Sequence, residues 1–301
     1  MVRRLIIVLM LSGVVYSCST DSGSSSSDEF EIPDSLFEDE PLVVAEEVLE
    51  DIIQNVSSPI ELAALIKNSG VPFSQKYMCG TEKAGQFTSS FQKALNLGIY
   101  GADLGYLNIY DKTGSAIDYI SAIKILSEDL KVGQFFDFTT LKRLATNNTD
   151  LDSLMYISVS SFNRMDRYLR ENSRGNISTL IITGVWVEGL YIATQVVKEK
   201  HIDEIAERIG EQKLVLGDLL IILKNYRSDA GFMELITRIE ELRKIYDDVT
   251  ISYELGEPEA SEEDGILKII QHETSHIQIT EEQLVKIVTA TEDIRNFIIN
   301  V

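Results

Sequence analysis

The chain of 301 residues is predicted to be mainly all-α: an antiparallel multi-helix array that allows a short β-hairpin near 249–279. Apolar residues recur every three or four positions along most of it, which is the period of one buried helix face. The links between these segments are short, and short links between long helices favour antiparallel neighbours. Five prolines, 18 glycines and two cysteines exclude a low-complexity chain and a disulfide scaffold.

Residues 1–17 have the layout of a secretory signal peptide. Arg3 and Arg4 give a positive start, and the mostly apolar segment Leu5–Val15 follows. This segment is shorter than the roughly 20 apolar residues that span a bilayer. A positive start, a short apolar core and small residues before a cleavage point form the signal-peptide pattern. We therefore expect residues 1–17 to be removed from the mature protein.

The end of this segment, Val15-Tyr16-Ser17-Cys18, resembles the lipobox of bacterial lipoproteins, in which a branched apolar residue and a small residue precede a cysteine. Tyr16 is larger than the residue usual at its position. The resemblance covers residues 3–18. It implies cleavage before Cys18, lipidation of the Cys18 thiol and acylation of the new amine. Palmitate is the fatty acid expected there. Ser19, directly after the cysteine, implies sorting to the outer membrane under the rule known from these lipoproteins.

A tether follows the lipidated cysteine. Six of the eleven residues from Ser19 to Glu29 are serine. Such a segment buries no apolar surface, so residues 18–32 are expected to form a flexible spacer, with a reach of roughly 20 Å by random-coil scaling. Residues 33–301 are expected to form a single helical domain, which the lipid holds at a membrane of the bacterial cell envelope.

The charge balance is strongly acidic. The chain has 48 acidic against 27 basic residues, a formal charge of −21, and loss of Arg3 and Arg4 leaves 25 basic residues and a charge of −23. A polyanion repels phosphate backbones, so we expect no nucleic-acid partner. It also repels anionic lipid surfaces, so the lipid anchor itself has to hold the protein at the membrane.

The helices can be followed in order. The first, at about 42–53, has apolar residues at helical spacing. The second begins at Ser58-Pro59, with Glu61 completing a capping box, and ends near Gly70. The others are expected at about 81–111, 115–130, 138–146, 149–172, 177–200, 203–226, 230–248 and 281–299.

Two of these helices, 81–111 and 177–200, mix glycines with aromatic residues and one acid. Glycine costs a helix up to about 1 kcal/mol relative to alanine. Gly98 and Gly184 are therefore expected to permit close approach of a neighbouring helix, and these two helices are expected to be the central ones.

Asp103 and Glu188 are candidate site residues because each lies on an apolar helix face. An acid in that position must be paired, protonated or functional, since burying it unpaired costs several kcal/mol. Arg164 and Arg167, on the helix at 149–172, are the expected partners. Two interpretations stay open: a buried ion pair that fixes the register of the helices, and a ligand pocket. An enzyme built around the two acids is a further alternative.

The segment 249–279 interrupts the helical pattern. Val249–Tyr253, Ile266–Ile270 and His276–Ile279 are rich in β-branched, aromatic or aliphatic residues and are expected to be extended. Glu254–Asp264 contains six acids and no basic residue, and is expected to be a solvated loop.

Residues 272–276 match the pattern H-E-x-x-H. In the zinc peptidases that this pattern resembles, one helical turn brings both histidines to the metal and the glutamate activates a bound water. Carried over, His272 and His276 would be ligands, Glu273 the base and Glu292 the third ligand. The motif requires a helix, whereas this segment favours an extended chain. A chance match is therefore preferred, no cofactor is expected, and zinc is the alternative.

The leading functional interpretation is a lipid-anchored helical envelope protein that binds or scaffolds an unknown protein or small-molecule partner without enzymatic activity. The alternative is a zinc metallopeptidase. Since Cys18 carries the lipid in this interpretation, Cys79 has no partner within the chain. Cys79 is expected to be a small buried apolar residue and not a nucleophile.

Overall fold

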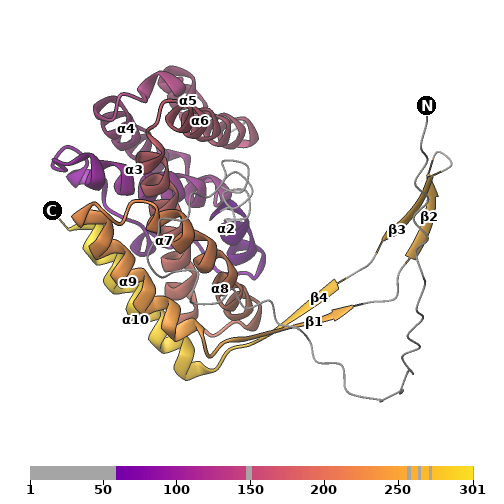
Figure 1. Ribbon diagram of the computed structural model, residues 1–301. Coiled ribbons are helices and arrows are strands. Elements are labelled where there is room, and N and C mark those ends of the chain that lie inside the picture. The colour runs from indigo at the N-terminus through magenta and orange to yellow at the C-terminus, as the bar shows by residue number, and fades with distance from the viewer. Residues whose placement is uncertain (1–58, 147–150, 256–258, 264–265, 271–272, 301) are drawn as a thin grey trace, which may run out of the picture. The chain divides into compact units, whose positions relative to one another are not determined.

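The computed structural model describes residues 59–146, 151–255, 259–263, 266–270 and 273–300. It is mainly all-α, as predicted (Figure 1). The α-helices are α2 (Pro59–Asn68), α3 (Ser90–Ile109), α4 (Thr113–Asp129), α5 (Phe138–Thr146), α6 (Leu151–Glu171), α7 (Gly175–Glu199), α8 (Asp203–Lys224), α9 (Ala230–Tyr246) and α10 (Glu281–Ile299). The signal peptide, the tether and the helix expected at 42–53 lie outside the described residues.

Most expected helices are found within a few residues of their predicted bounds, but the long one is shorter than predicted. Residues 75–89 contain only the 3-10 turns η2 (Gln75–Tyr77) and η3 (Thr81–Lys83), and α3 begins at Ser90. Ser89 is the N-cap, and its hydroxyl accepts from the Gln92 amide while the Gln92 side chain returns to the cap. The helix expected from residue 81 was therefore wrong over its first turns, because this capping box starts the helix later.

Neighbouring helices run antiparallel where contacts fix their direction. Lys93 and Asp129, and then Tyr100 and Tyr119, meet between α3 and α4. Between α8 and α9, the Tyr246 hydroxyl donates to the Ile209 carbonyl at 3.0 Å. Lys224 meets Glu240 nearer the other end of the same pair. In both pairs, contacts that lie further along the first helix are made by residues nearer the start of the second. The two helices of each pair are therefore antiparallel, as short links favour.

The central contact is the crossing of α3 and α7, the most extensive between any two elements described. Gly98 and Gly184 face the opposite backbone there. A Cβ atom on Gly184 would lie 2.0 Å from the Leu95 carbonyl oxygen, and one on Gly98 would lie 2.1 Å from the Ile181 carbonyl oxygen. These glycines therefore set how closely the two helices pack, as expected from the sequence.

Helix α7 is apolar on nearly all sides. By length and composition it could cross a membrane, but 72% of its most apolar window is buried within the structure. Trp186 shows how it is enclosed: the ring is buried, and its Nε1 donates to Gln212 on α8 at 3.0 Å. A helix that is apolar all round is typical of the centre of a helical body, which is where α7 lies.

The segment 249–279 forms antiparallel strand pairs, as its extended pattern predicted. Strand β1 (Thr250–Leu255) pairs with β4 (Glu273–Gln278), and β2 (Glu259–Glu263) pairs with β3 (Ile266–Ile270). The strand β2 corrects the sequence analysis, which expected a solvated loop over Glu254–Asp264. Backbone pairing with β3 makes these residues extended despite the weak strand propensity of glutamate, since that propensity depends strongly on context.

Substitution of Gly184 by alanine tests the helix crossing. The new Cβ would meet backbone that cannot move aside, so we expect Gly184→Ala to lower the free energy of unfolding by about 2–3 kcal/mol in urea titrations. Gly217→Ala in α8 is the control, because its Cβ would have its nearest neighbour, Arg243 Nη1, at 3.9 Å. The control is expected to gain up to about 1 kcal/mol from helix propensity. Equal stability of the two variants would contradict the proposed role of the crossing.

Candidate functional site

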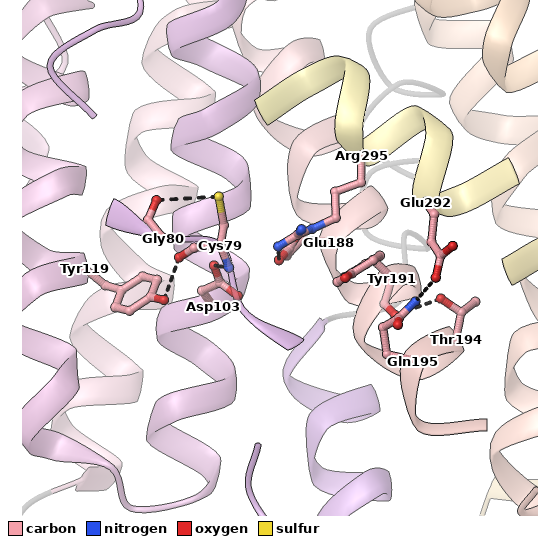
Figure 2. A network of polar contacts seen from close by, with 10 residues as sticks. All are labelled: Cys79, Gly80, Asp103, Tyr119, Glu188, Tyr191, Thr194, Gln195, Glu292 and Arg295. Atoms are coloured by element: carbon pink, nitrogen blue, oxygen red, sulfur yellow. Dashed lines mark hydrogen bonds and ion pairs between the residues drawn. The ribbon is translucent and has the colours of Figure 1, made fainter. Parts of the chain in front are cut away.

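The buried charged side chains of the described residues lie together in the interior and come from three helices. Asp103 on α3 and Glu188 on α7 are 0% exposed, and Arg295 on α10 is 6% exposed. Asp103 follows Gly98 and Glu188 follows Gly184, so the close helix crossing brings the two acids together. Figure 2 shows Arg295 reaching from α10 toward Glu188, with Asp103 beside Cys79.

Arg295 and Glu188 form a two-point ion pair. Arg295 Nε donates to Glu188 Oε2 at 2.6 Å, and Arg295 Nη2 donates to Glu188 Oε1 at 2.7 Å. The guanidinium carbon lies 3.9 Å from the centre of the Tyr191 ring, so the cation also rests on an aromatic face. Both oxygens of Glu188 are thereby used, and α10 is fixed to α7 by charge and by geometry.

The arginine partner is not the one that the sequence analysis expected. Arg164 and Arg167 are exposed on α6, and Arg164 Nη2 donates to the Phe135 carbonyl at 3.0 Å. The buried face of α6 carries Leu154, Ser161 and Met165, which directs both arginines outward. The expectation of an Arg164 or Arg167 partner is therefore corrected to Arg295.

A signal for Arg295 was present in the sequence. Val288, Ile294 and Ile298 are buried on α10, and Arg295 lies among them at helical spacing. An arginine on an apolar helix face needs a partner for the same reason as Asp103 and Glu188 do, so its spacing marks it as a candidate partner for a buried acid. Sequence alone gives no distance between α10 and α7, so the pairing required the fold.

Asp103 holds the irregular segment that precedes α3. Its Oδ2 accepts from the Cys79 amide at 3.0 Å. The Tyr119 hydroxyl donates to the Cys79 carbonyl at 2.7 Å, and the Tyr100 hydroxyl donates to the Gly80 carbonyl at 3.1 Å. Three side chains from α3 and α4 thus satisfy the backbone of a segment that makes few hydrogen bonds of its own.

Burial and charge set the protonation of this cluster. Burial, followed by the neighbouring charge of Glu188, raises the pKa of Asp103 well above its ordinary value. Burial opposes the charge of Arg295, but Glu188 outweighs it and keeps the pKa of that guanidinium raised. Burial also raises the pKa of the Cys79 thiol to about 12. Cys79, at 6% exposure, is therefore a protonated apolar residue and not a ready nucleophile.

The zinc-peptidase pattern lacks the helix that it needs. Residues Glu273–Gln278 are strand β4, whose successive side chains point to opposite faces. The His276 side chain is 52% exposed, with Nε2 3.5 Å from Glu254 Oε2. His272 lies outside the described residues. Strand geometry does not allow the one-turn convergence of two imidazoles that the pattern requires.

Glu292, the third ligand in that alternative, has other partners. Its Oε1 accepts from Gln195 Nε2 at 2.8 Å and from Lys198 Nζ at 2.5 Å, so it forms a second α7–α10 contact (Figure 2). Burial acts to raise the pKa of Glu292, but the bonds from Lys198 and Gln195 outweigh it and lower the pKa. In the described part of the chain, no three His, Cys, Asp or Glu side chains are grouped as a metal would require.

A surface cleft of about 420 Å³ lies where α8, the base of the strand pair β1–β4 and the start of α10 meet. Its walls include the carboxylates of Asp203, Glu207 and Asp248, with Ile277 and Ile279 as apolar lining. Ile277 also packs at Gly210, where an added Cβ would approach it to 2.5 Å. This charge distribution favours a cationic group over an anionic one.

The chain was compared with known proteins. No family model, curated protein or solved structure matches it significantly. Asp103, Glu188 and Arg295 bind one another and the backbone around Cys79, so they join three helices and one irregular segment in a closed interior.

The ion pair can be tested by removing either member. Because each single change leaves a buried charge without its partner, Glu188→Gln and Arg295→Met are each expected to lower the free energy of unfolding by about 3–5 kcal/mol. The double variant should lose less than the sum of the two, since the stranded charge is gone. Urea unfolding measures all three.

Glu282→Gln is the matched control. Glu282 pairs with Lys286 on the surface of the same helix, and its removal should leave the unfolding transition nearly unchanged. Strictly additive losses in Glu188→Gln and Arg295→Met would show that the two side chains do not act as a pair.

Proposed function

We propose that this protein is a lipid-anchored component of the bacterial cell envelope that works by binding or scaffolding a partner. The observation that carries the proposal is the ordered N-terminal series: Arg3 and Arg4, a short apolar core, Val15-Tyr16-Ser17-Cys18 and a serine-rich spacer. Each part has a role in making and positioning a lipid-anchored domain. The outer membrane is the proposed location, from Ser19 next to the anchor.

The lipid supplies the membrane attachment in this proposal. A mature charge of −23 opposes binding to anionic headgroups, whereas acyl chains contribute about 0.8 kcal/mol per buried CH₂ and hold stably when more than one is attached. The spacer at 18–32 gives the helical domain room to stand clear of the headgroups and to meet a partner.

A binding role is favoured over catalysis by the state of the interior acids. Catalytic carboxylates have to reach a substrate, whereas Asp103 and Glu188 are fully buried and bound to Cys79 and Arg295. Such a cluster fixes the positions of helices and presents a stiff surface for contact. The partner is a protein or a small molecule, and nucleic acid is disfavoured by the negative charge.

Replacement of Cys18 tests the anchor. Cys18→Ala should abolish lipidation and leave either uncleaved precursor or protein released from the membrane fraction. Mass spectrometry of the N-terminus, with membrane fractionation, measures both outcomes. Cys79→Ala is the control, because Cys79 is buried in the helical body and its removal should leave the lipid in place. An unmodified Cys18 in the parent protein, or cleavage elsewhere, would refute the proposal.

Metal analysis separates the binding role from the zinc-peptidase alternative. The purified mature protein is expected to hold no stoichiometric zinc after dialysis against a zinc-containing buffer, because Glu273–Gln278 is strand β4 and not the helix that the motif requires. His272→Ala and the surface control His201→Ala should then behave like the parent. One zinc per chain that is lost in His272→Ala and kept in His201→Ala would overturn the binding proposal in favour of the peptidase.

A further inference from the structure

The interior cluster contains more acidic than basic groups, and its two acids do not accept the same number of hydrogen bonds. Two carboxyl groups, Asp103 and Glu188, face a single guanidinium, that of Arg295. Both oxygens of Glu188 accept from Arg295, whereas among the described residues a single bond, from the Cys79 amide, reaches Asp103 at Oδ2. Asp103 Oδ1 is completely buried and receives no hydrogen bond from the described residues. A bare carboxylate oxygen in such a place costs several kcal/mol.

A proton on Asp103 removes this cost. Asp103 lies within hydrogen-bonding reach of Glu188. A carboxylic acid donates from its O–H, and a carboxylate that already accepts from Arg295 has lone pairs left to accept it. The protonated acid would therefore satisfy its own free oxygen and add a bond to Glu188, and the net negative charge of the cluster would be neutralised.

We infer that Asp103 is a carboxylic acid in the folded protein and donates a hydrogen bond from Oδ1 to Glu188. One proton then joins the segment around Cys79 to the α7–α10 ion pair. Loss of that proton places two carboxylates against one arginine and weakens the joint between three helices and this segment. The contact between Asp103 and Glu188 therefore depends on a proton: it is made while Asp103 is protonated and is weakened as the pH rises.

The other groups that face Asp103 do not replace it as the titrating residue. Cys79 in the irregular segment has its pKa raised to about 12 by burial. Tyr100 on α3 and Tyr119 on α4 have their pKa raised above the ordinary range by burial. Arg295 on α10 stays charged beside Glu188 on α7. Farther out, Glu82 acts on Tyr100, and Lys83 acts on Cys79.

Asp103→Asn isolates the proton. Asparagine can accept from the Cys79 amide with its oxygen and donate to Glu188 with its nitrogen, so it keeps both bonds and cannot ionise. Because the pKa of Asp103 is higher in the folded than in the unfolded chain, the stability from its proton is complete below the unfolded pKa of about 3.9 and is lost as the pH rises toward the folded pKa. Asp103→Asn lacks this loss.

The expected result is a growing advantage of Asp103→Asn over the parent as the pH rises above about 4. The ratio of their unfolding equilibrium constants should change by up to about tenfold per pH unit until the folded pKa is reached. Urea unfolding across the pH range measures it. A ratio that stays constant above about pH 4 would overturn the inference, since it means that Asp103 is ionised in the folded protein.

Asp137→Asn is the control of opposite sign. Asp137 is exposed and accepts from the Thr140 hydroxyl and amide, which lowers its pKa. The stability contributed by ionised Asp137 is present above the unfolded pKa and is lost as the pH falls through the folded pKa. The stability of the parent relative to Asp137→Asn should therefore change with pH only in the acid range, where it increases as the pH rises. The two variants thus differ in both the sign and the pH window of their effect.

A spectroscopic measurement on the protein with Asp103 intact keeps the inference testable if Asp103→Asn fails to fold. Isotope-edited infrared spectra with ¹³C-carboxyl aspartate should show the carbonyl band of a protonated aspartic acid at neutral pH. The band should persist in Asp218→Asn, which removes another aspartate whose pKa is raised by burial. Absence of a protonated aspartate band in Asp218→Asn would overturn the inference.

Discussion

The bidentate pair of Arg295 and Glu188 is the interaction on which the helical body depends. It is made by residues 107 positions apart, on α7 and α10, and it lies where α3 also packs. The two buried charges stabilise each other because two N–H groups of Arg295 meet the two oxygens of Glu188 and the Tyr191 ring covers the cation. A helix displaced by one residue would lose this match, so the pair selects a single register among apolar surfaces that could otherwise slide.

The pair lies beside the close crossing of the α3 and α7 backbones. Gly98 and Gly184 leave no side-chain atoms between them, and this crossing holds Asp103 against Glu188. The same closeness excludes water from the acids, which strengthens the ion pair and raises the energetic cost of any unpaired group. Close packing and buried charge are therefore one feature of the molecule: the glycines create the low-dielectric site, and the charges fix its geometry.

The consequences extend to the segment before α3 and to the surface. Residues 75–89 form no regular helix of useful length, and Asp103, Tyr100 and Tyr119 bind their backbone from the interior. The last helix, α10, begins next to the strand pair β1–β4, and Gln283 Nε2 donates to the Asp248 carbonyl at 2.7 Å. This bond lies at the cleft, whose lining includes both Asp248 and Gln283.

The sequence by itself determined the mainly helical class, most helix bounds, the close approach at Gly98 and Gly184, and the burial of Asp103 and Glu188, because each depends on local spacing. It also carried the N-terminal pattern at Cys18, which lies outside the described residues. Only the tertiary structure decided that Arg295 and not Arg164 meets Glu188, that α3 starts at Ser90, and that β2 pairs with β3. The reason is physical: a periodicity fixes which face of a helix is buried, whereas the partner of a buried charge depends on distances between elements far apart in the chain.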